Sequence, residues 1–401
     1  MRREELARMA IGMMALLLPY AGAFTALPLA VIFILDPGSR MLSAAIAMLL
    51  VMRPALSVTH INLPLYAIAI SIVASTFAPL AFKKFDVLAG SIIYLMITVA
   101  LGYPIAAAIS AGGLSPERIL FLSLLGGLSG AFLHHVSKER DFTVPFGTAM
   151  VIWLFSFDYP LPDLQRILLI CIFALVLGIG AYWARAADSD AVLSETIICL
   201  LVILFGGLTW FLLLLAFYLL GGAFTHYGYA RKNKLGIAQS RGGRRGYKNV
   251  YSNSLVPLIM AICYGVYGGD IFVYAFIGSV ATANGDTLAS EIGQTSRSNP
   301  RMITTMRETE AGVDGGVTPL GEAASLAGSL VIGLLATGTG MIGTMGIAVG
   351  TLGGFLGTNF DSLLGATMQR RGLLSNSGVN LVATAFGALV GGLLWYILQQ
   401  I

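Results

Sequence analysis

Acidic side chains gather in one stretch of a chain that is otherwise mostly apolar. Residues 281–322 read ATANGDTLASEIGQTSRSNPRMITTMRETEAGVDGGVTPLGE, and their carboxylates are Asp286, Glu291, Glu308, Glu310, Asp314 and Glu322. A charged side chain at the centre of a bilayer costs about 2.5 to 3.5 kcal/mol on insertion scales, so acids beside membrane spans tend to serve a function. This density of acids between apolar runs predicts either a functional site or a polar loop.

The spacing of the first acids in this stretch suits a hard cation. If residues 285–293 form a helix, Asp286 and Ser290 lie one turn apart on one face, and Glu291 lies on the neighbouring stripe. Mg²⁺ is usually bound by one or two protein carboxylates together with substrate phosphate oxygens. We therefore predict a Mg²⁺ site that pairs Asp286 with Glu291 or with Asp361, and we assign catalytic roles to these three acids.

Asp361 is the last acid in the chain and begins a second motif, DSLLGATMQ. Gln369 ends this motif, and Asn376 and Asn380 follow at a four-residue spacing before the final apolar run. Helix capping accounts for the asparagines as well as a binding role does. A lone acid where an apolar span meets a polar helix favours function, because burying it near the bilayer is costly.

Glycines follow the acidic stretch closely. Gly312, Gly315 and Gly316 precede Thr318, and glycine lets backbone N–H groups approach phosphate oxygens. A flexible turn before a helix accounts for the same pattern equally well. Both interpretations stay open: a phosphate-binding loop or an ordinary turn. The sequence has no GxxxxGK[ST] motif, so the chain is not a P-loop enzyme.

A basic segment without acids lies upstream, at residues 225–250. Its cations are Arg231, Lys232, Lys234, Arg241, Arg244, Arg245 and Lys248. The positive-inside rule places this segment on the cytoplasmic side, and topology together with contacts to anionic lipids could explain every cation in it. The adjacent Arg244 and Arg245 also lie between glycines, and the planar guanidinium is suited to bidentate binding of phosphate.

The elements that must position these residues are transmembrane helices. Hydrophobic residues make up 57% of the 401-residue chain and charged residues 11%, and the mean hydropathy is +0.83. Charged residues are near a quarter of a soluble protein, so this is a polytopic membrane protein. We predict an all-α fold with roughly 12 to 14 spans. The three cysteines lie in apolar runs at no metal-ligand spacing, so neither a zinc nor a redox role follows.

The chain is predicted to divide into two parts, 1–166 and 167–401. The first part is a transmembrane region without a chemical motif, and the second holds every motif described above. In the second part, Gly346, Gly350 and Gly354 form overlapping GxxxG steps, which predict close helix packing.

Helical hairpins are predicted to bring the polar segments of the second part to one side. Residues 192–224 are nearly all apolar and pivot on Gly206-Gly207, which suits two spans joined by a tight turn. The later spans are predicted at 254–267, 271–283, 323–336, 341–357 and 381–398. Because each hairpin returns the chain to the side it came from, the segments 225–250, 284–318 and 359–380 should share the cytoplasmic face.

Several of these motifs together resemble one known family. They are GGRRGYKNVYSN at 242–253, ANGDTLASEIG at 283–293, GVDGGVTPLG at 312–321 and DSLLGATMQ at 361–369. In this order they resemble the integral membrane family that includes the plant phytyl-phosphate kinase of tocopherol synthesis. The resemblance covers roughly 167–401 and leaves 1–166 unexplained. A weaker similarity, through Gly285-Asp286 and Ala289-Ser290, links the chain to dolichol and phytol kinases.

The resemblance implies a membrane kinase in the cell membrane that transfers a phosphoryl group from a nucleoside triphosphate, with CTP favoured, to an isoprenoid monophosphate such as phytyl or geranylgeranyl phosphate. On this interpretation Asp286 and Asp361 bind Mg²⁺ and Glu291 assists them. Phosphates are bound by Lys232, Lys234, Arg244, Arg245, Gly315, Gly316 and Thr318. Substrates are positioned by Asn253, Asn284, Thr287, Ser290, Gln369, Asn376 and Asn380. The isoprenoid tail lies among the glycine-rich spans. Membrane lipid is an expected partner and nucleic acid is not. Whether the chain forms a homo-oligomer stays open.

Two other functions are compatible with the same polar motifs. A cytidylyltransferase acting on a phospholipid precursor would release pyrophosphate from CTP with the same metal and phosphate contacts. A transporter or flippase of a phosphorylated lipid would instead place discontinuous helices and polar groups near the bilayer midplane, often in inverted repeats. The polar motifs of this chain gather in segments on one predicted face, which favours an enzyme.

Membrane topology offers a direct test of the shared face. Single cysteines placed in 225–250, 284–318 and 359–380 should all react with a membrane-impermeant thiol reagent from the cytoplasmic side. The background should lack Cys171, Cys199 and Cys263. Labelling of the basic segment and the GDT segment from opposite sides would make one composite site impossible.

Overall fold

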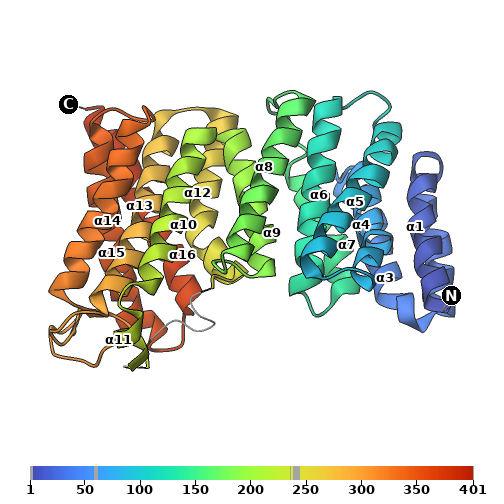
Figure 1. Ribbon diagram of the computed structural model, residues 1–401. Coiled ribbons are helices and arrows are strands. Elements are labelled where there is room, and N and C mark those ends of the chain that lie inside the picture. Colours follow the sequence, from blue (N-terminus) through green and yellow to red (C-terminus); the bar gives the residue numbers. More distant parts are fainter. Residues whose placement is uncertain (1–2, 58–61, 235, 238–243, 401) are drawn as a thin grey trace. The chain divides into compact units, whose positions relative to one another are not determined.

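A computed structural model describes residues 3–57, 62–234, 236–237 and 244–400 (Figure 1). The chain forms two compact units, Met1–Leu175 and Val176–Ile401, and each is described by itself. The predicted division after residue 166 falls within helix α8, Leu164–Trp183, which contains the boundary between the units.

The predicted all-α polytopic class is confirmed. Within the described residues, nine helical segments are long and apolar enough to cross a membrane: Pro37–Leu56, Leu65–Lys83, Val87–Ser110, Pro116–Val136, Leu164–Trp183, Leu208–His226, Tyr247–Tyr267, Pro319–Gly338 and Asn376–Leu398. A total of roughly 12 to 14 spans would require other helices of unit 2, such as α9, α13 and α15, to cross as well.

Unit 1 is a bundle around one buried helix. Its helices are α1 (Arg3–Ala21), α2 (Ala26–Leu35), α3 (Arg40–Ser57), α4 (Leu65–Thr76), α5 (Val87–Ser110), α6 (Pro116–Val136) and α7 (Arg140–Leu154). Helix α4 packs against α1, α5 and α7, and its residues from Ala67 to Thr76 are all buried. An ion pair of 2.6 Å between Arg8 Nη2 and Asp141 Oδ2 joins α1 to α7.

Unit 2 contains the hairpins that the apolar runs predict. Its helices are α9 (Ser189–Phe205), α10 (Leu208–His226), α11 (Tyr229–Lys234), α12 (Tyr247–Tyr267), α13 (Asp270–Gly293), α14 (Pro319–Gly338), α15 (Met345–Leu364) and α16 (Asn376–Leu398). Gly207, at φ +96°, makes the tight turn between α9 and α10. Helices α12 and α13 are both longer than predicted. Helix α12 begins at Tyr247, before the predicted start at 254, and α13 continues as a helix through the whole ANGDTLASEIG motif.

Helix α13 is the centre of unit 2, since α12, α14, α15 and α16 all pack against it. Glycine makes this packing close enough for backbones to touch. A Cβ on Gly278 of α13 would collide with the carbonyl oxygen of Gly387 on α16, and one on Gly350 of α15 would lie 2.6 Å from the Cα of Gly333 on α14. The predicted GxxxG packing is therefore confirmed.

Candidate active site

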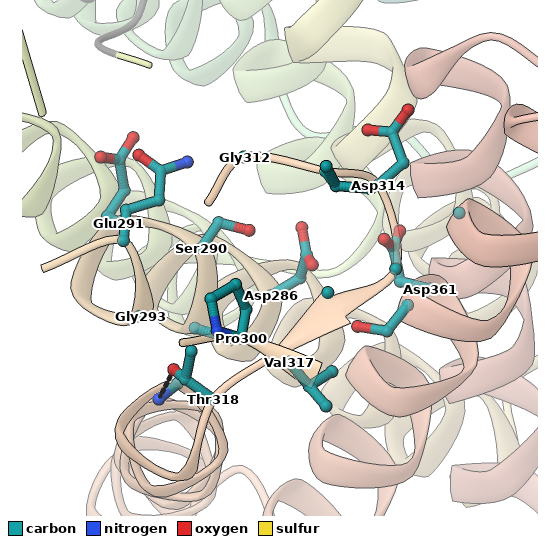
Figure 2. Close-up of a pocket in the computed structure, with 18 of the residues that line it drawn as sticks. Asp286, Ser290, Glu291, Gly293, Pro300, Gly312, Asp314, Val317, Thr318 and Asp361 are labelled. Carbon is teal, nitrogen blue, oxygen red and sulfur yellow. Dashed lines mark hydrogen bonds between the residues drawn. The ribbon is translucent and has the colours of Figure 1, made fainter. Parts of the chain in front are cut away.

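A cavity of about 450 Å³ lies at one end of the unit 2 helices (Figure 2). Its volume is within the usual range of ligand sites. Helices α11 to α16 and the segments between them line it, and the lining comes from all three predicted polar segments, 225–250, 284–318 and 359–380. The hairpins thus bring these segments together, as predicted.

Two carboxylates face this cavity from different helices. Asp286 projects from α13 and Asp361 from α15, and the charge on Asp361 is coupled to those of Asp286 and Asp314 (Figure 2). Within the described part of the chain, Asp361 Oδ2 is buried without a hydrogen-bond partner. Like charges in a desolvated space repel, so a cation or a proton is needed to offset them.

The donor set fits Mg²⁺ better than a transition metal. In the residues that the structure describes, no group of three or more His, Cys, Asp or Glu side chains is close enough to hold a metal ion. Mg²⁺ does not require such a cage, because it keeps several waters and takes its other ligands from substrate phosphates. An unpartnered buried carboxylate oxygen facing a second carboxylate is consistent with that ion.

The predicted roles of Glu291 and Lys232 are corrected by the structure. Lys232 Nζ lies 2.5 Å from Glu291 Oε2, and the two side chains are only 1% and 3% exposed. Lys232 also donates to the carbonyl of Thr225 at 2.8 Å, and the Thr225 hydroxyl donates to Glu291 Oε1 at 3.3 Å. Figure 2 shows Glu291 directed away from Asp286 and Asp361. Glu291 lines the cavity, but its charge is paired with that of Lys232, which does not line it.

The adjacent arginines lie in different environments. Arg244 is exposed and outside the lining of the cavity, whereas Arg245 lines it. The Arg245 guanidinium lies over two rings of α10, with its carbon 4.8 Å from the centroid of Phe217 and 5.5 Å from that of Tyr218. Its Nη1 has no hydrogen-bond partner among the described residues. Of the two adjacent arginines, only Arg245 therefore has the position that a phosphate ligand in the cavity requires.

Lys234 is also exposed and outside the cavity lining. Like Arg244, it is a predicted phosphate ligand that the structure leaves at the surface. For both, topology and contacts to anionic lipids stay the alternative interpretation.

The glycine-rich turn is both an ordered turn and a wall of the cavity. Gly315 has φ +80°, and a Cβ there would collide with Ala366. The turn leads into strand β2, Gly316–Val317, which pairs antiparallel with β1, Arg301–Met302. Thr318 then caps α14, because its Oγ1 accepts a 3.0 Å hydrogen bond from Gly321 N. The two interpretations of this motif are therefore compatible.

Most of the predicted substrate-positioning residues line the cavity. They are Asn253, Thr287, Ser290, Gln369, Asn376 and Asn380. Gln369 lies on a π-helical turn, Gly365–Gln369, of a kind that is frequent at functional sites. Asn284 is the exception, because it is buried and its Nδ2 donates to the carbonyl of Gly328 at 2.8 Å. It joins α13 to α14 and does not line the cavity.

Several lining residues lacked an assigned role from the sequence. They are Arg231, Asn249, Arg297, Asn299, Asp314, Glu322 and Ser362. Asn249 could have been found, since it precedes Asn253 by four residues, the spacing that marks Asn376 and Asn380. Asp314 lies inside the glycine-rich motif itself. Arg231, Glu322 and Ser362 lie on helices, and Arg297 and Asn299 lie in the loop after α13, whose path over the helices has no local sequence signal.

The comparisons with known proteins agree with this architecture. The profile of the integral membrane protein family DUF92 matches residues 172–388, and the chain belongs to this family, so the resemblance that the motifs indicate is confirmed. An uncharacterised membrane protein of Methanocaldococcus jannaschii is 35% identical over 230 residues, which are 57% of this chain and 92% of that one. An uncharacterised membrane protein of Synechocystis is 34% identical over 195 residues, or 47% of this chain and 76% of that one. The chloroplastic protein VTE6 of Arabidopsis thaliana is 29% identical over 212 residues, 49% of this chain and 64% of VTE6. No solved structure matches the chain.

The Lys232–Glu291 pair predicts a characteristic stability pattern. Lys232→Met alone should lower the free energy of unfolding by about 3 to 5 kcal/mol, because it leaves a buried carboxylate without its partner. Lys232→Met with Glu291→Leu should recover most of that loss, because both charges are removed. Thermal unfolding of the detergent-solubilised protein measures this, with the exposed Lys234→Met as the matched control. Equal losses in the single and double variants would contradict the pairing.

Proposed function

We propose that the protein is a membrane kinase that transfers a phosphoryl group from a nucleoside triphosphate, with CTP favoured, to an isoprenoid monophosphate at the cytoplasmic face of the cell membrane. One observation carries this proposal: a polar cavity lined by two carboxylates, and by a guanidinium whose Nη1 has no partner among the described residues, opens at the end of an apolar helix bundle. Membership of a family that includes the plant phytyl-phosphate kinase, by the resemblance of the motifs, supports the choice of substrate.

Asp286 and Asp361 would hold the Mg²⁺ of this reaction. When bound, the ion would neutralise charge on the phosphate oxygens and so lower the cost of bringing two anions together. Through that ion the two carboxylates would position the triphosphate end of the nucleotide. Glu291 takes no part, because its charge is already neutralised by Lys232.

Arg245 and the glycine-rich turn bind the phosphates in this proposal. The Arg245 Nη1 donates to a nonbridging phosphate oxygen, and the glycine-rich turn lets the backbone at Gly315 approach the phosphates, while Gly316 N already donates to the carbonyl of Val313. An oxygen of the isoprenoid monophosphate attacks the γ-phosphorus. The bond from that phosphorus to the β–γ bridging oxygen breaks, so a nucleoside diphosphate leaves. No general base is required, because the attacking phosphate is already an anion and the transfer relies on positioning.

Product analysis tests the reaction class. The purified protein is incubated with Mg²⁺, labelled CTP and a panel that includes phytyl and geranylgeranyl phosphate. We expect CDP and the matching prenyl diphosphate. Pyrophosphate with a CDP-lipid would indicate a cytidylyltransferase instead. The absence of turnover with CTP, UTP, ATP or GTP would overturn the proposal.

The carboxylate pair gives a sharp prediction. Asp286→Asn and Asp361→Asn should each lower kcat/KM by about a hundredfold or more, because removing a ligand of the metal forfeits several kcal/mol of transition-state stabilisation. Size-exclusion profiles and unfolding temperatures serve as controls for folding. Activity at the wild-type level in both purified, folded variants would remove the metal assignment.

Lysine substitutions of the two adjacent arginines should have different effects on activity. Arg245→Lys keeps the charge but loses the planar fork, which should cost roughly 1.5 to 3 kcal/mol, or about tenfold to a hundredfold in kcat/KM. Arg244→Lys is the matched control and should leave the kinetics unchanged, since its side chain lies outside the cavity lining. The substrate whose KM rises identifies the phosphate that Arg245 binds. Equal kinetics for both variants would show that Arg245 is not a phosphate ligand.

A further inference from the structure

The hydrocarbon chain of the acceptor must leave the polar cavity between helices. This question rests on the proposed function, because only an isoprenoid acceptor has such a chain. The helices that line the cavity surround α13. The hydrocarbon chain could therefore leave between two neighbouring helices of this group, and we call each such helix–helix contact a seam. Each seam can be judged by what fills it.

The seam between α14 and α15 is closed by backbone and by a polar bridge. Gly350 and Gly333 touch at backbone distance, which leaves no space for a chain. At the cavity end, Asn359 Nδ2 donates to Glu322 Oε2 at 3.1 Å across the same two helices. Opening this seam would separate rigid backbones and break a hydrogen bond.

The seam between α15 and α16 is closed in a similar way. The rings of Phe360 and Phe386 stack across it, with centroids 4.2 Å apart. Behind them, a Cβ on Gly353 would lie 3.6 Å from the carbonyl oxygen of Gly387 on α16. The glycine-rich spans expected to hold the isoprenoid tail are therefore closely packed against each other.

On the side of the cavity that faces α10, a buried ion pair blocks the path of a hydrocarbon chain. The buried Lys232–Glu291 pair fills this side, together with the hydroxyl of Thr225 on α10. A hydrocarbon chain passing here would have to displace or desolvate both ions, which is unfavourable.

The seam between α12 and α16 has a different construction. Asn253 of α12 and Asn380 of α16 line the cavity. Beyond them, Met260 and Leu381 are partly buried hydrophobic residues packed against a small apolar cluster of Val256, Ala275 and Ala388. The contact is made by side chains, and the single glycine within α12, Gly265, faces Phe205 of α9 instead.

Two local features make this seam adjustable. Methionine and leucine can change rotamer at low cost, unlike glycine backbones in contact. Pro257 lies inside α12 and lacks the N–H that would bond to the carbonyl of Asn253, which weakens the helix at the level of the cavity. The two helices can therefore separate at this seam without breaking backbone hydrogen bonds.

We propose that the prenyl chain of the acceptor lies in the α12–α16 seam, over Met260 and Leu381, with its monophosphate at Asn376 and Asn380 of the cavity wall. The Asn253 Nδ2 already donates to the carbonyl of Asn249 at 2.9 Å, so the phosphate is left to the two asparagines of α16. Their carboxamide N–H groups can donate to phosphate oxygens but carry no charge. They fix the acceptor without neutralising the anion that must attack. The Mg²⁺ and Arg245 groups would then serve the nucleotide triphosphate.

A change of chain length tests this placement. Leu381→Trp fills the seam, so in the full-length protein with Mg²⁺ and CTP it should raise KM for geranylgeranyl phosphate about tenfold or more, the scale of discrimination that hydrophobic pockets reach. The KM values for dimethylallyl phosphate and CTP should stay unchanged, because neither molecule reaches the seam. Met260→Trp should act alike from α12. Leu352→Trp on α15, whose side chain is 47% exposed, is the matched control and should have no effect that depends on chain length.

A second readout does not depend on turnover. A geranylgeranyl phosphate analogue with a terminal diazirine should label peptides of α12 and α16 on illumination, and excess geranylgeranyl phosphate should suppress the labelling. Labelling of α14 or α15, or equal effects of Leu381→Trp on short and long acceptors, would overturn the proposal. A wild-type protein that binds the analogue at α12 and α16 but phosphorylates no prenyl phosphate would refute the kinase function while leaving the chain site in place.

Discussion

The contact between the α13 backbone and its neighbours is the constraint on which the rest of unit 2 depends. Glycines at this centre let α14, α15 and α16 approach until backbones touch, so these helices cannot shift without separating close-packed surfaces. Asp286 projects from α13 and Asp361 from α15. The rigidity of the bundle therefore holds two carboxyl groups in one cavity although their charged forms repel each other.

The charged side chains inside unit 2 are of two kinds, those that pair with each other and those that keep an unpartnered polar atom. Lys232 and Glu291 are buried and neutralise each other, which makes them part of the fold. Asp361 and Arg245 are partly buried, yet each keeps one buried polar atom without a partner among the described residues. Leaving such an atom unsatisfied costs free energy, which the rest of the structure must offset. In the proposed function, this difference separates the structural ions from the ones that bind ligands.

Sequence reasoning predicted the fold better than the detailed chemistry. Hydropathy and paired glycines located the hairpins of unit 2 and the segments that meet at the cavity, because these signals are local. The Lys232–Glu291 pair joins residues 59 positions apart, and nothing in either neighbourhood indicates the partner. Arg244 and Arg245 are adjacent in the chain, yet only the rings of α10 decide which one is buried. Asn284 lies within the strongest motif but packs between helices, since a motif does not say which face of a helix each residue occupies.

The stacking of Arg245 on Phe217 and Tyr218 has a consequence for the energetics of binding. An arginine on the surface loses rotamer freedom when it binds an anion, and that loss weakens the complex. Here the rings hold the guanidinium before any anion arrives. The entropic cost of ordering this side chain is thus met during folding. If Arg245 binds a phosphate as proposed, its affinity depends on the integrity of helix α10, which itself contributes no residue to the cavity lining.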